Sequence, residues 1–263
     1  MEVIILLGEK DVGYAAAKRI GKVITSRTEP VLGLATGGSP TGTYRELVRM
    51  HQQEGLDFSR VRTFNLDEYL GLDPSHPASY CHFMRTNLFD HVNLRPRSAV
   101  VPSGMVVGQE IESYCEKYEE EIRQAGGIDL QLLGIGSDGH IGFNEPGSSL
   151  TSRTRIKNLT KRTREDNARY FSNPDEIPHH VITMGIGTIM EAREIVLIAF
   201  GKAKAAAIAA AVEGPITTSC PASILQMHPN AKVIVDEAAA SLLQRAEYYR
   251  WVFDNKPDWQ KDR

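Results

Sequence analysis

The stretch Leu132–Ser149, LLGIGSDGHIGFNEPGSS, decides how the rest of this chain is organised. It begins inside the apolar run Leu130–Ile135, whose glycine boundaries predict a strand of a parallel sheet. In open α/β sheets, ligands bind beyond the carboxyl ends of the strands. The glycine-rich turn that follows, with Asp138, His140 and Glu145, is therefore the predicted active site.

Asp138 and His140 are two residues apart, so in extended backbone their side chains project to the same side. A carboxylate beside an imidazole fixes its tautomer and supports its protonated form. The pair is thus predicted to transfer protons.

Other interpretations of this turn are weaker. Gly134–Gly139 spells the G-x-G-x-x-G pattern of dinucleotide-binding loops, but that pattern should open a helix, and helix-breaking residues fill the range 142–147. A metal site that adds His179 or His180 lacks any H-E-x-x-H or paired-cysteine spacing, so no metal is expected. A histidine satisfied in a surface loop is the plainest alternative.

The composition narrows the class of protein. The 263 residues suffice for one large α/β domain, and Lys+Arg 30 against Asp+Glu 33 gives no basis for binding nucleic acid or membrane. The apolar run Val3–Leu7 is too short for a signal peptide or a membrane span, which predicts a cytoplasmic protein. Cys81, Cys115 and Cys220 show no C-x-x-C pairing and are predicted to be reduced and structural.

Strand-like and helix-like runs alternate along the chain, which predicts an α/β fold of Rossmann-like type, a mostly parallel sheet with helices on both faces. The predicted strands are Val3–Leu7, Val31–Ala35, Val61–Asn65, Ala99–Val101, Leu130–Ile135, Val181–Met184, Ile195–Phe200 and Val233–Val235. With no repeat and no long linker, residues 1–263 are predicted to form a single domain. The polar segment 148–170 is the candidate lid or insertion.

A second glycine-rich turn, GLATGGSPTG at 33–42, follows the second predicted strand and precedes the predicted helix Tyr44–His51. Backbone N–H groups at Gly37, Gly38 and Ser39, with the helix N-terminus, are suited to a phosphate. No Gly-Lys-Ser/Thr is present, so the turn is not a Walker A loop and favours a phosphorylated small molecule over a nucleotide. A plain strand-to-helix turn is the alternative.

Two cationic side chains are candidates to complete this phosphate site. Lys204 follows a predicted strand directly, at the start of an alanine-rich helix, and Arg169 lies in the helix-like run Thr163–Phe171. Either can instead be a solvated surface charge, the usual fate of lysine and arginine.

Asp67 and Glu68 follow the predicted strand Val61–Asn65, again at a carboxyl end. A carboxylate there can act as a general base toward a carbon acid, particularly when desolvation raises its pKa. Side chains of consecutive residues diverge, so only one of the two is expected to face the pocket. The residue pattern does not decide which.

Together these pieces resemble the glucosamine-6-phosphate deaminases along nearly the whole chain. The motifs that carry the resemblance are Leu34-Ala-Thr-Gly-Gly-Ser-Pro, Phe64-Asn-Leu-Asp-Glu-Tyr, Asp138-Gly-His-Ile-Gly-Phe-Asn-Glu-Pro and Ser149-Leu-Thr-Ser-Arg-Thr-Arg-Ile-Lys. The related 6-phosphogluconolactonases share the phosphate loop and an Asp-Gly-His segment, but the continuation Phe-Asn-Glu-Pro and the Asp-Glu-Tyr motif are not expected of them.

The resemblance implies a hydrolase of amino-sugar and N-acetylglucosamine catabolism that converts D-glucosamine 6-phosphate to D-fructose 6-phosphate and ammonia. His140, oriented by Asp138 and Glu145, resembles the residue that moves the proton for ring opening. Asp67 resembles the base that takes the C2 proton and returns a proton at C1 through an enolic intermediate. The residues that resemble the phosphate site are Gly37, Gly38, Ser39, Arg169 and Lys204. No cofactor is expected, because the substrate's own carbonyl is the electron sink, although a Schiff base on Lys204 is a chemical alternative.

In allosteric members of this family, N-acetylglucosamine 6-phosphate binds between the subunits of a hexamer, so the resemblance also implies a homo-oligomer. The residues that resemble the effector site are Ser148, Ser149, Arg155 and Lys157. The chain departs from the allosteric pattern at Asn158, where that pattern has threonine, and at Tyr248–Tyr249, which do not align with the effector-site tyrosine.

Two other functions stay open at this point. A lactonase would use His140 to activate water against an ester carbonyl. A non-catalytic sugar-phosphate sensor would use the same fold, although no helix-turn-helix segment precedes Val3. The motifs do not separate glucosamine 6-phosphate from its galactosamine epimer.

Overall fold

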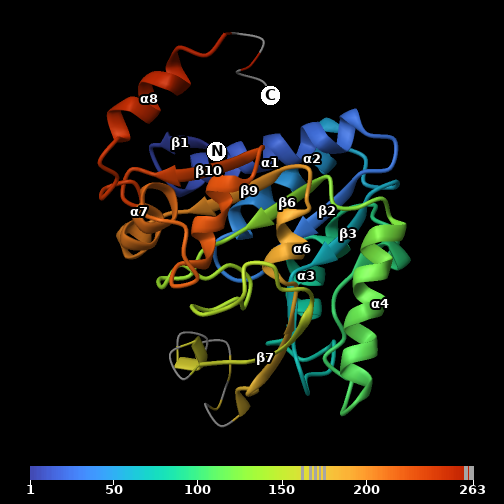
Figure 1. The fold of residues 1–263 in the computed structure, drawn as a ribbon. Coiled ribbons are helices and arrows are strands. Elements are labelled where there is room, and N and C mark those ends of the chain that lie inside the picture. Colours follow the sequence, from blue (N-terminus) through green and yellow to red (C-terminus); the bar gives the residue numbers. More distant parts are fainter. Residues whose placement is uncertain are drawn as a thin grey trace.

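The main element of the fold is a seven-stranded sheet in the order β1-β10-β9-β6-β2-β3-β5, and each of these neighbouring pairs is parallel. The computed structural model describes residues 1–160, 163–165, 168, 171, 173, 176–257 and 260. The strands of this sheet are β1 (Glu2–Leu6), β2 (Val31–Leu34), β3 (Arg62–Asn65), β5 (Ala99–Val100), β6 (Leu130–Leu133), β9 (Ile195–Ala199) and β10 (Ala231–Asp236). The mostly parallel α/β sheet that the sequence predicts is therefore confirmed (Figure 1).

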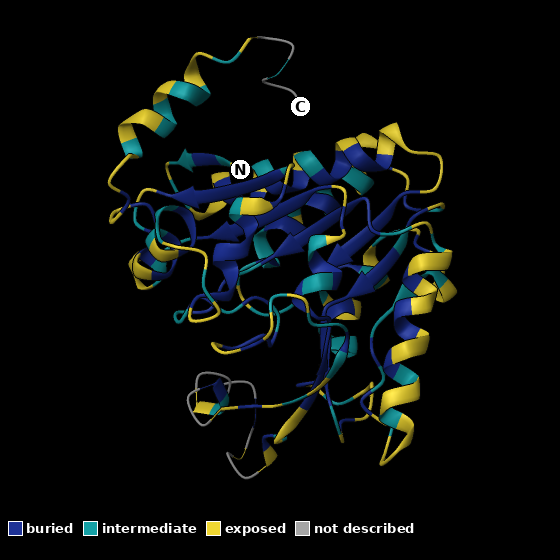
Figure 2. Ribbon diagram, in the orientation of Figure 1, coloured by how far each residue is buried: buried dark blue, intermediate teal, exposed yellow. Residues whose placement is uncertain are grey.

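Helices cover both faces of this sheet. On one face they are α1 (Glu9–Ser26), α2 (Thr41–Glu54) and α3 (Tyr80–Asn87), and on the other α4 (Glu110–Gln124), α6 (Ile186–Met190) and α7 (Ala205–Glu213). Leu132 packs into the first of these two cores and Leu133 into the second. Because both faces are covered, the strands read as continuous apolar runs, and they are almost entirely buried (Figure 2).

Helix α1 shows why these elements form. Val12, Ala16, Ile20 and Val23 recur with the helical period, and all of them are buried. The last helix, α8 (Ala246–Asp254), lies at the top of Figure 1 and has no fully buried residue, although Ala246 and Tyr249 pack against the core. None of the described helices has the length and apolar composition that crossing a membrane requires. Short 3-10 segments complete the described elements at Phe89–His91, Pro96–Ser98, Lys202–Lys204 and Pro221–Met227.

A second, three-stranded antiparallel sheet lies apart from the main one, in the order β4-β8-β7. Its strands are β4 (Asp67–Tyr69), β7 (Arg155–Asn158) and β8 (His180–Thr183). The prediction of a strand near Val181–Met184 is confirmed, but its implied place in the parallel sheet is wrong. β7 was not predicted, because its residues alternate between half-buried and exposed and form no apolar run. This strand lies within the candidate lid segment 148–170.

Candidate active site

The predicted site lies at a switch point of the main sheet. β2 leads through α2 to β3 on one side, whereas the neighbouring strand β6 leads on to β9 on the other side. The loops after these two strands therefore diverge, which opens a crevice at the carboxyl ends. A cavity of about 500 Å³ fills this crevice and is lined by both glycine-rich turns and by Asp67, His140 and Lys204.

The structure adds lining residues to which the sequence analysis gave no role, although several of them lie inside its motifs. They are Thr36, Leu66, Tyr80, Ser137, Phe143, Thr163 and Ala203, among others. The rings of Tyr80 and Phe143 stack with centroids 6.1 Å apart and an angle of 10° between their planes. Tyr80 starts helix α3 after a loop, so its place beside the cavity follows only from tertiary packing.

A larger cavity of about 890 Å³ lies elsewhere, between α1, the turn after α2 and the end of α8, and none of the predicted site residues lines it. Several of its cations are already paired, as Lys232 and Lys256 are with Glu2. The smaller cavity has the convergent polar groups that mark a reaction site, so it is the better candidate for the active site than the larger one.

Asp138 and His140 form the pair that their spacing predicts. His140 Nδ1 lies 2.7 Å from Asp138 Oδ1, and the same oxygen accepts the backbone N–H of His140 at 3.1 Å. The hydrogen bond from His140 holds the pKa of Asp138 at about 2. Since Nδ1 faces the carboxylate, this contact assigns Nε2 as the ring nitrogen that is left for proton transfer. Gly136 makes room for the ring, because a Cβ there would lie 2.2 Å from two of its atoms.

Asp67 lies on β4, lines the cavity and is only 5% exposed. Burial, together with the charge of Glu68, raises the pKa of Asp67 to about 8. Its Oδ2 lies close to Gly142, where an added Cβ would be 3.4 Å away and where φ is +57°, a conformation that favours glycine. Gly136 thus leaves room for the ring of His140, and Gly142 lets the same turn pack against Asp67.

Glu68 turns away from the cavity and caps helix α3. Its carboxylate accepts the Ser79 hydroxyl at 2.7 Å and the backbone N–H groups of Tyr69, Tyr80 and Cys81 at 2.9, 3.0 and 2.9 Å. The N–H groups of Tyr80 and Cys81 are among the donors that a helix start leaves unpaired. The structure thereby decides what the residue pattern left open, since Asp67 faces the cavity and Glu68 does not.

Glu145 is buried but is placed differently from the expectation. Its Oε1 accepts hydrogen bonds from Thr160 N at 3.2 Å, Thr160 Oγ1 at 2.9 Å and Thr163 Oγ1. Within the described residues its side-chain hydrogen bonds go to this segment and none goes to His140. Glu145 therefore ties the His140 turn to the candidate lid. No three His, Cys, Asp or Glu side chains of the described part of the chain come together as a metal ion would need.

The predicted phosphate turn also lines the cavity. Gly37 has φ +87°, which a non-glycine residue adopts only with strain, and Gly38 and Ser39 follow it before α2 begins. Lys204 Nζ donates to the carbonyl of Ile135 at 2.7 Å, at the end of the strand region that carries the His140 turn. Arg169 lies outside the described residues.

The four candidate effector residues lie away from this cavity, before β7 and on it. Ser148 is buried and Ser149 is exposed. Arg155 and Lys157 are two residues apart on β7 and share a face of the small sheet. Burial lowers the pKa of Arg155, whose guanidinium donates to the carbonyl of Arg153 at 3.1 Å.

Comparison with known proteins points to one family. The profile of the Glucosamine-6-phosphate isomerases/6-phosphogluconolactonase family matches residues 9–235. A glucosamine-6-phosphate deaminase of Arthrobacter sp. (strain FB24) is 56% identical over 260 residues, which cover 99% of each chain. The deaminase of Rhodococcus opacus (strain B4) is 54% identical over 260 residues, again 99% of each.

Solved structures separate the two branches of this family. A glucosamine-6-phosphate deaminase described as monomeric matches with a TM-score of 0.89 and 43% identity, covering 92% of this chain and 100% of its own. A 6-phosphogluconolactonase from Trypanosoma cruzi shares the fold, with a TM-score of 0.72 over 92% of this chain and 97% of its own, but only 20% of the sequence. The chain belongs to the glucosamine-6-phosphate isomerase/6-phosphogluconolactonase family, and within it to the glucosamine-6-phosphate deaminases.

Proposed function

We propose that this protein converts D-glucosamine 6-phosphate to D-fructose 6-phosphate and ammonia by isomerising deamination. The observation that carries the proposal is one cavity whose walls bring together a phosphate-type turn, an Asp138–His140 pair and the buried carboxyl of Asp67. The names of the relatives, which are more than 50% identical over nearly the whole chain, give the substrate.

Binding and ring opening use the two glycine-rich turns. The backbone N–H groups of Gly37–Ser39 and the ammonium of Lys204 hold the phosphate, and Arg169 is proposed to join them. His140, kept in one tautomer by Asp138, moves the proton between the ring oxygen and the C1 hydroxyl. The products of this step are an open chain with a free aldehyde and an acidified C2–H bond.

Asp67 then carries the isomerisation. It takes the C2 proton while the C1 oxygen gains one, which gives an enolamine with a C1=C2 double bond. Asp67 then returns its proton to C1, so the electron pair of the old C2–H bond becomes the new C1–H bond and the nitrogen lone pair closes the C2=N bond of an iminium. Water adds to this carbon and ammonia leaves, so the second half cleaves a C–N bond hydrolytically while the first half is an aldose–ketose isomerisation. The substrate's own carbonyl is the electron sink for removal of the C2 proton, and its amine supplies the electron pair of the iminium.

The ionisation of the Asp67 carboxyl should appear in the pH dependence of kcat/KM. Only the ionised carboxylate accepts a proton, and the pKa of Asp67 in the empty cavity is about 8, so kcat/KM should rise with pH and level off above that value. Measuring kcat/KM from pH 6 to 9.5 checks this. Glu68→Gln removes the neighbouring like charge and should move the rising part of the kcat/KM profile, its acid limb, to lower pH. If the substrate's own amine caused this acid limb, the substitution would leave it in place. A flat profile over this range contradicts the assignment.

Gly136→Ala tests the position of His140. An alanine Cβ would overlap the imidazole, so the ring must shift, and a shift of about 1 Å costs about 100-fold in rate. We expect kcat to fall by about that factor while the protein stays folded. Gly8→Ala is the matched control, because a Cβ at Gly8 meets no atom within 4 Å. A variant at 136 with the wild-type rate would show that His140 does not act from this position.

The lid and the effector site are part of the same proposal. The segment 148–170 is proposed to act as a lid on the single domain 1–263, and what supports this among its described residues is the pair of hydrogen bonds from Thr160 to Glu145. Ser148, Ser149, Arg155 and Lys157 bind an anionic effector such as N-acetylglucosamine 6-phosphate. A hyperbolic rate curve unchanged by that compound would contradict this. The hexamer stays a prediction, and since one relative is described as monomeric, the mass in solution decides it.

The first test is coupled detection of ammonia and fructose 6-phosphate from glucosamine 6-phosphate and, separately, from its galactosamine epimer. Stoichiometric formation of both products supports the deaminase. No ammonia from either substrate contradicts it, and hydrolysis of 6-phosphogluconolactone would then identify the lactonase. Binding without any turnover would identify a sensor.

A further inference from the structure

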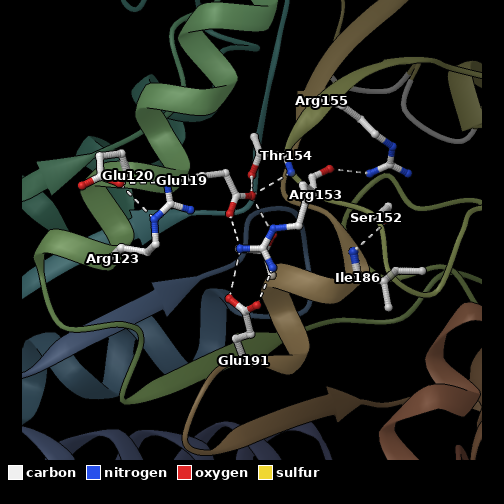
Figure 3. A network of polar contacts seen from close by, with 10 residues as sticks. Glu119, Glu120, Arg123, Ser152, Arg153, Thr154, Arg155, Ile186 and Glu191 are labelled. Atoms are coloured by element: carbon white, nitrogen blue, oxygen red, sulfur yellow. Dashed lines mark hydrogen bonds and ion pairs between the residues drawn. The ribbon is translucent and has the colours of Figure 1, made fainter.

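The carboxylate of Glu119 on α4 is a buried acceptor outside the cavity. Its Oε1 accepts the Thr154 backbone N–H at 2.7 Å, the Thr154 hydroxyl at 2.5 Å and the Thr188 hydroxyl at 2.6 Å, and its Oε2 pairs with Arg153 Nη2 at 2.6 Å. Figure 3 shows Glu119 on α4 in contact with Arg153 and Thr154 from the segment before β7, and Thr188 belongs to α6. One side chain therefore joins three elements that are distant in sequence.

The charges in this network favour an ionised Glu119. Burial by itself would raise the pKa of Glu119, but the hydrogen bonds from Thr154 and Thr188 and the charge of Arg153 outweigh it and hold the pKa below its ordinary value. Arg153 also pairs with the exposed Glu191 at 2.6 Å. A carboxylate with this many donors has one favoured position, and removing its charge leaves buried donors unpaired.

The network lies directly before the sheet that carries Asp67. Arg155, the residue after Thr154, pairs in register with Thr183 of β8, and Thr183 pairs in register with Asp67 of β4. Beyond Thr183 the chain passes through Gly185 into α6, where Ile186 N donates to Ser152 Oγ at 3.1 Å and Gly187 N to the Ser152 carbonyl at 2.8 Å (Figure 3). Arg155, Thr183 and Asp67 therefore form one row of paired residues across the small sheet. The contacts of Glu119 and Ser152 hold β7 and the segment after β8 beside this row.

We infer that Glu119 is a positioning residue for Asp67. It fixes β7 and α6, these two elements fix β8, and β8 in turn holds strand β4, which carries Asp67. The inference rests on the proposed function. The phosphate turn and Lys204 belong to loops of the main sheet, and none of the contacts of Glu119 described above reaches them. Glu119 should therefore affect proton transfer at C2 and not the binding of the phosphate.

Glu119→Gln tests this with little change of shape. We expect kcat to fall by about tenfold, less than the roughly 100-fold cost of a 1 Å displacement, with KM within about twofold of wild type. The acid limb of kcat/KM should move to lower pH, because a looser β4 admits water to Asp67. Glu120→Gln is the matched control, since Glu120 is the next residue and is half-exposed. Among the described residues its carboxylate pairs along its own helix, with Arg123 (Figure 3) and with Gln124. It should behave as wild type.

Thr188→Val removes one donor from α6 at constant volume and should lower kcat in the same way but less, which keeps the test intact if Glu119→Gln folds poorly. Amide hydrogen exchange of residues 180–183 reports the position of β8 without any turnover and should become faster in both variants. The inference would be overturned if the variants had a lower melting temperature but kept the wild-type kcat, the wild-type acid limb of kcat/KM and the wild-type amide exchange. A rise in KM at unchanged kcat would overturn it as well. If the wild type itself releases no ammonia, the proposed function fails instead, and the exchange result still decides whether Glu119 holds the sheet.

Discussion

Replacing Asp67 by asparagine should lower kcat for ammonia release by about 10²–10⁴-fold, the range that a positioned general acid–base group contributes. Asparagine has nearly the shape of aspartate but cannot accept the C2 proton. KM should change little, because the proposed phosphate site uses other lining residues of the cavity, Gly37–Ser39 and Lys204. The measurement is a coupled assay of ammonia and fructose 6-phosphate with purified variants.

The same substitution should stabilise the folded protein at alkaline pH. In the folded state the Asp67 carboxyl keeps its proton up to about pH 8, whereas in the unfolded chain it loses the proton near pH 3.8. Between these values the folded state binds more protons, so the free energy of unfolding falls as the pH rises. Asparagine does not titrate, and its advantage should grow from almost nothing at pH 4 to a few kcal/mol at pH 9, since each pKa unit corresponds to about 1.4 kcal/mol.

Urea unfolding at both pH values checks this gain in stability. Asp73→Asn is the matched control, because Asp73 is exposed in the turn after β4 and, in the described part of the chain, its carboxylate accepts hydrogen bonds from Ser75 alone. It should change neither rate nor stability appreciably. An Asp67→Asn protein that retains the wild-type rate, or that is less stable at pH 9, would remove Asp67 from the role of desolvated base.

Replacing His140 by glutamine should cost about 10²–10⁴-fold in kcat as well, but at a different step. Glutamine fills part of the same space and cannot carry the proton between the ring oxygen and the C1 hydroxyl. Uncatalysed ring opening then limits the rate. With substrate deuterated at C2, the isotope effect on kcat should fall toward one in this variant, because opening the ring breaks no C2–H bond.

The isotope effect separates His140 from Asp67, since both variants lose activity. A full isotope effect in His140→Gln would place His140 at or after the C2 proton transfer and would contradict the ring-opening role. His179→Gln is the control, because His179 is exposed and serves the fold through its backbone carbonyl, which accepts the N–H of Leu159. Its rate and its isotope effect should match those of the wild type.

Most of the main sheet could be predicted from the sequence because its strands are buried on both faces. A run such as Leu130–Leu133 has to be apolar wherever it lies in the sheet. Such a strand can therefore be predicted from its own residues, without knowledge of its neighbours. The small sheet gave no comparable signal. Its strands β4 and β7 are short and polar, and each of them pairs with the central strand β8 of this sheet.

The sequence by itself determined the residues able to do the chemistry and the order of the strands that carry them. Asp138 and His140 are two residues apart in one turn, so local geometry was enough to bring them together. The choice of Asp67 over Glu68, the contacts of Glu145 with Thr160, the stack of Tyr80 on Phe143 and the clamp at Glu119 were decided only by the tertiary structure. Each of these depends on which elements meet across the fold, and hydrophobic period and turn chemistry carry no information about partners distant in the chain.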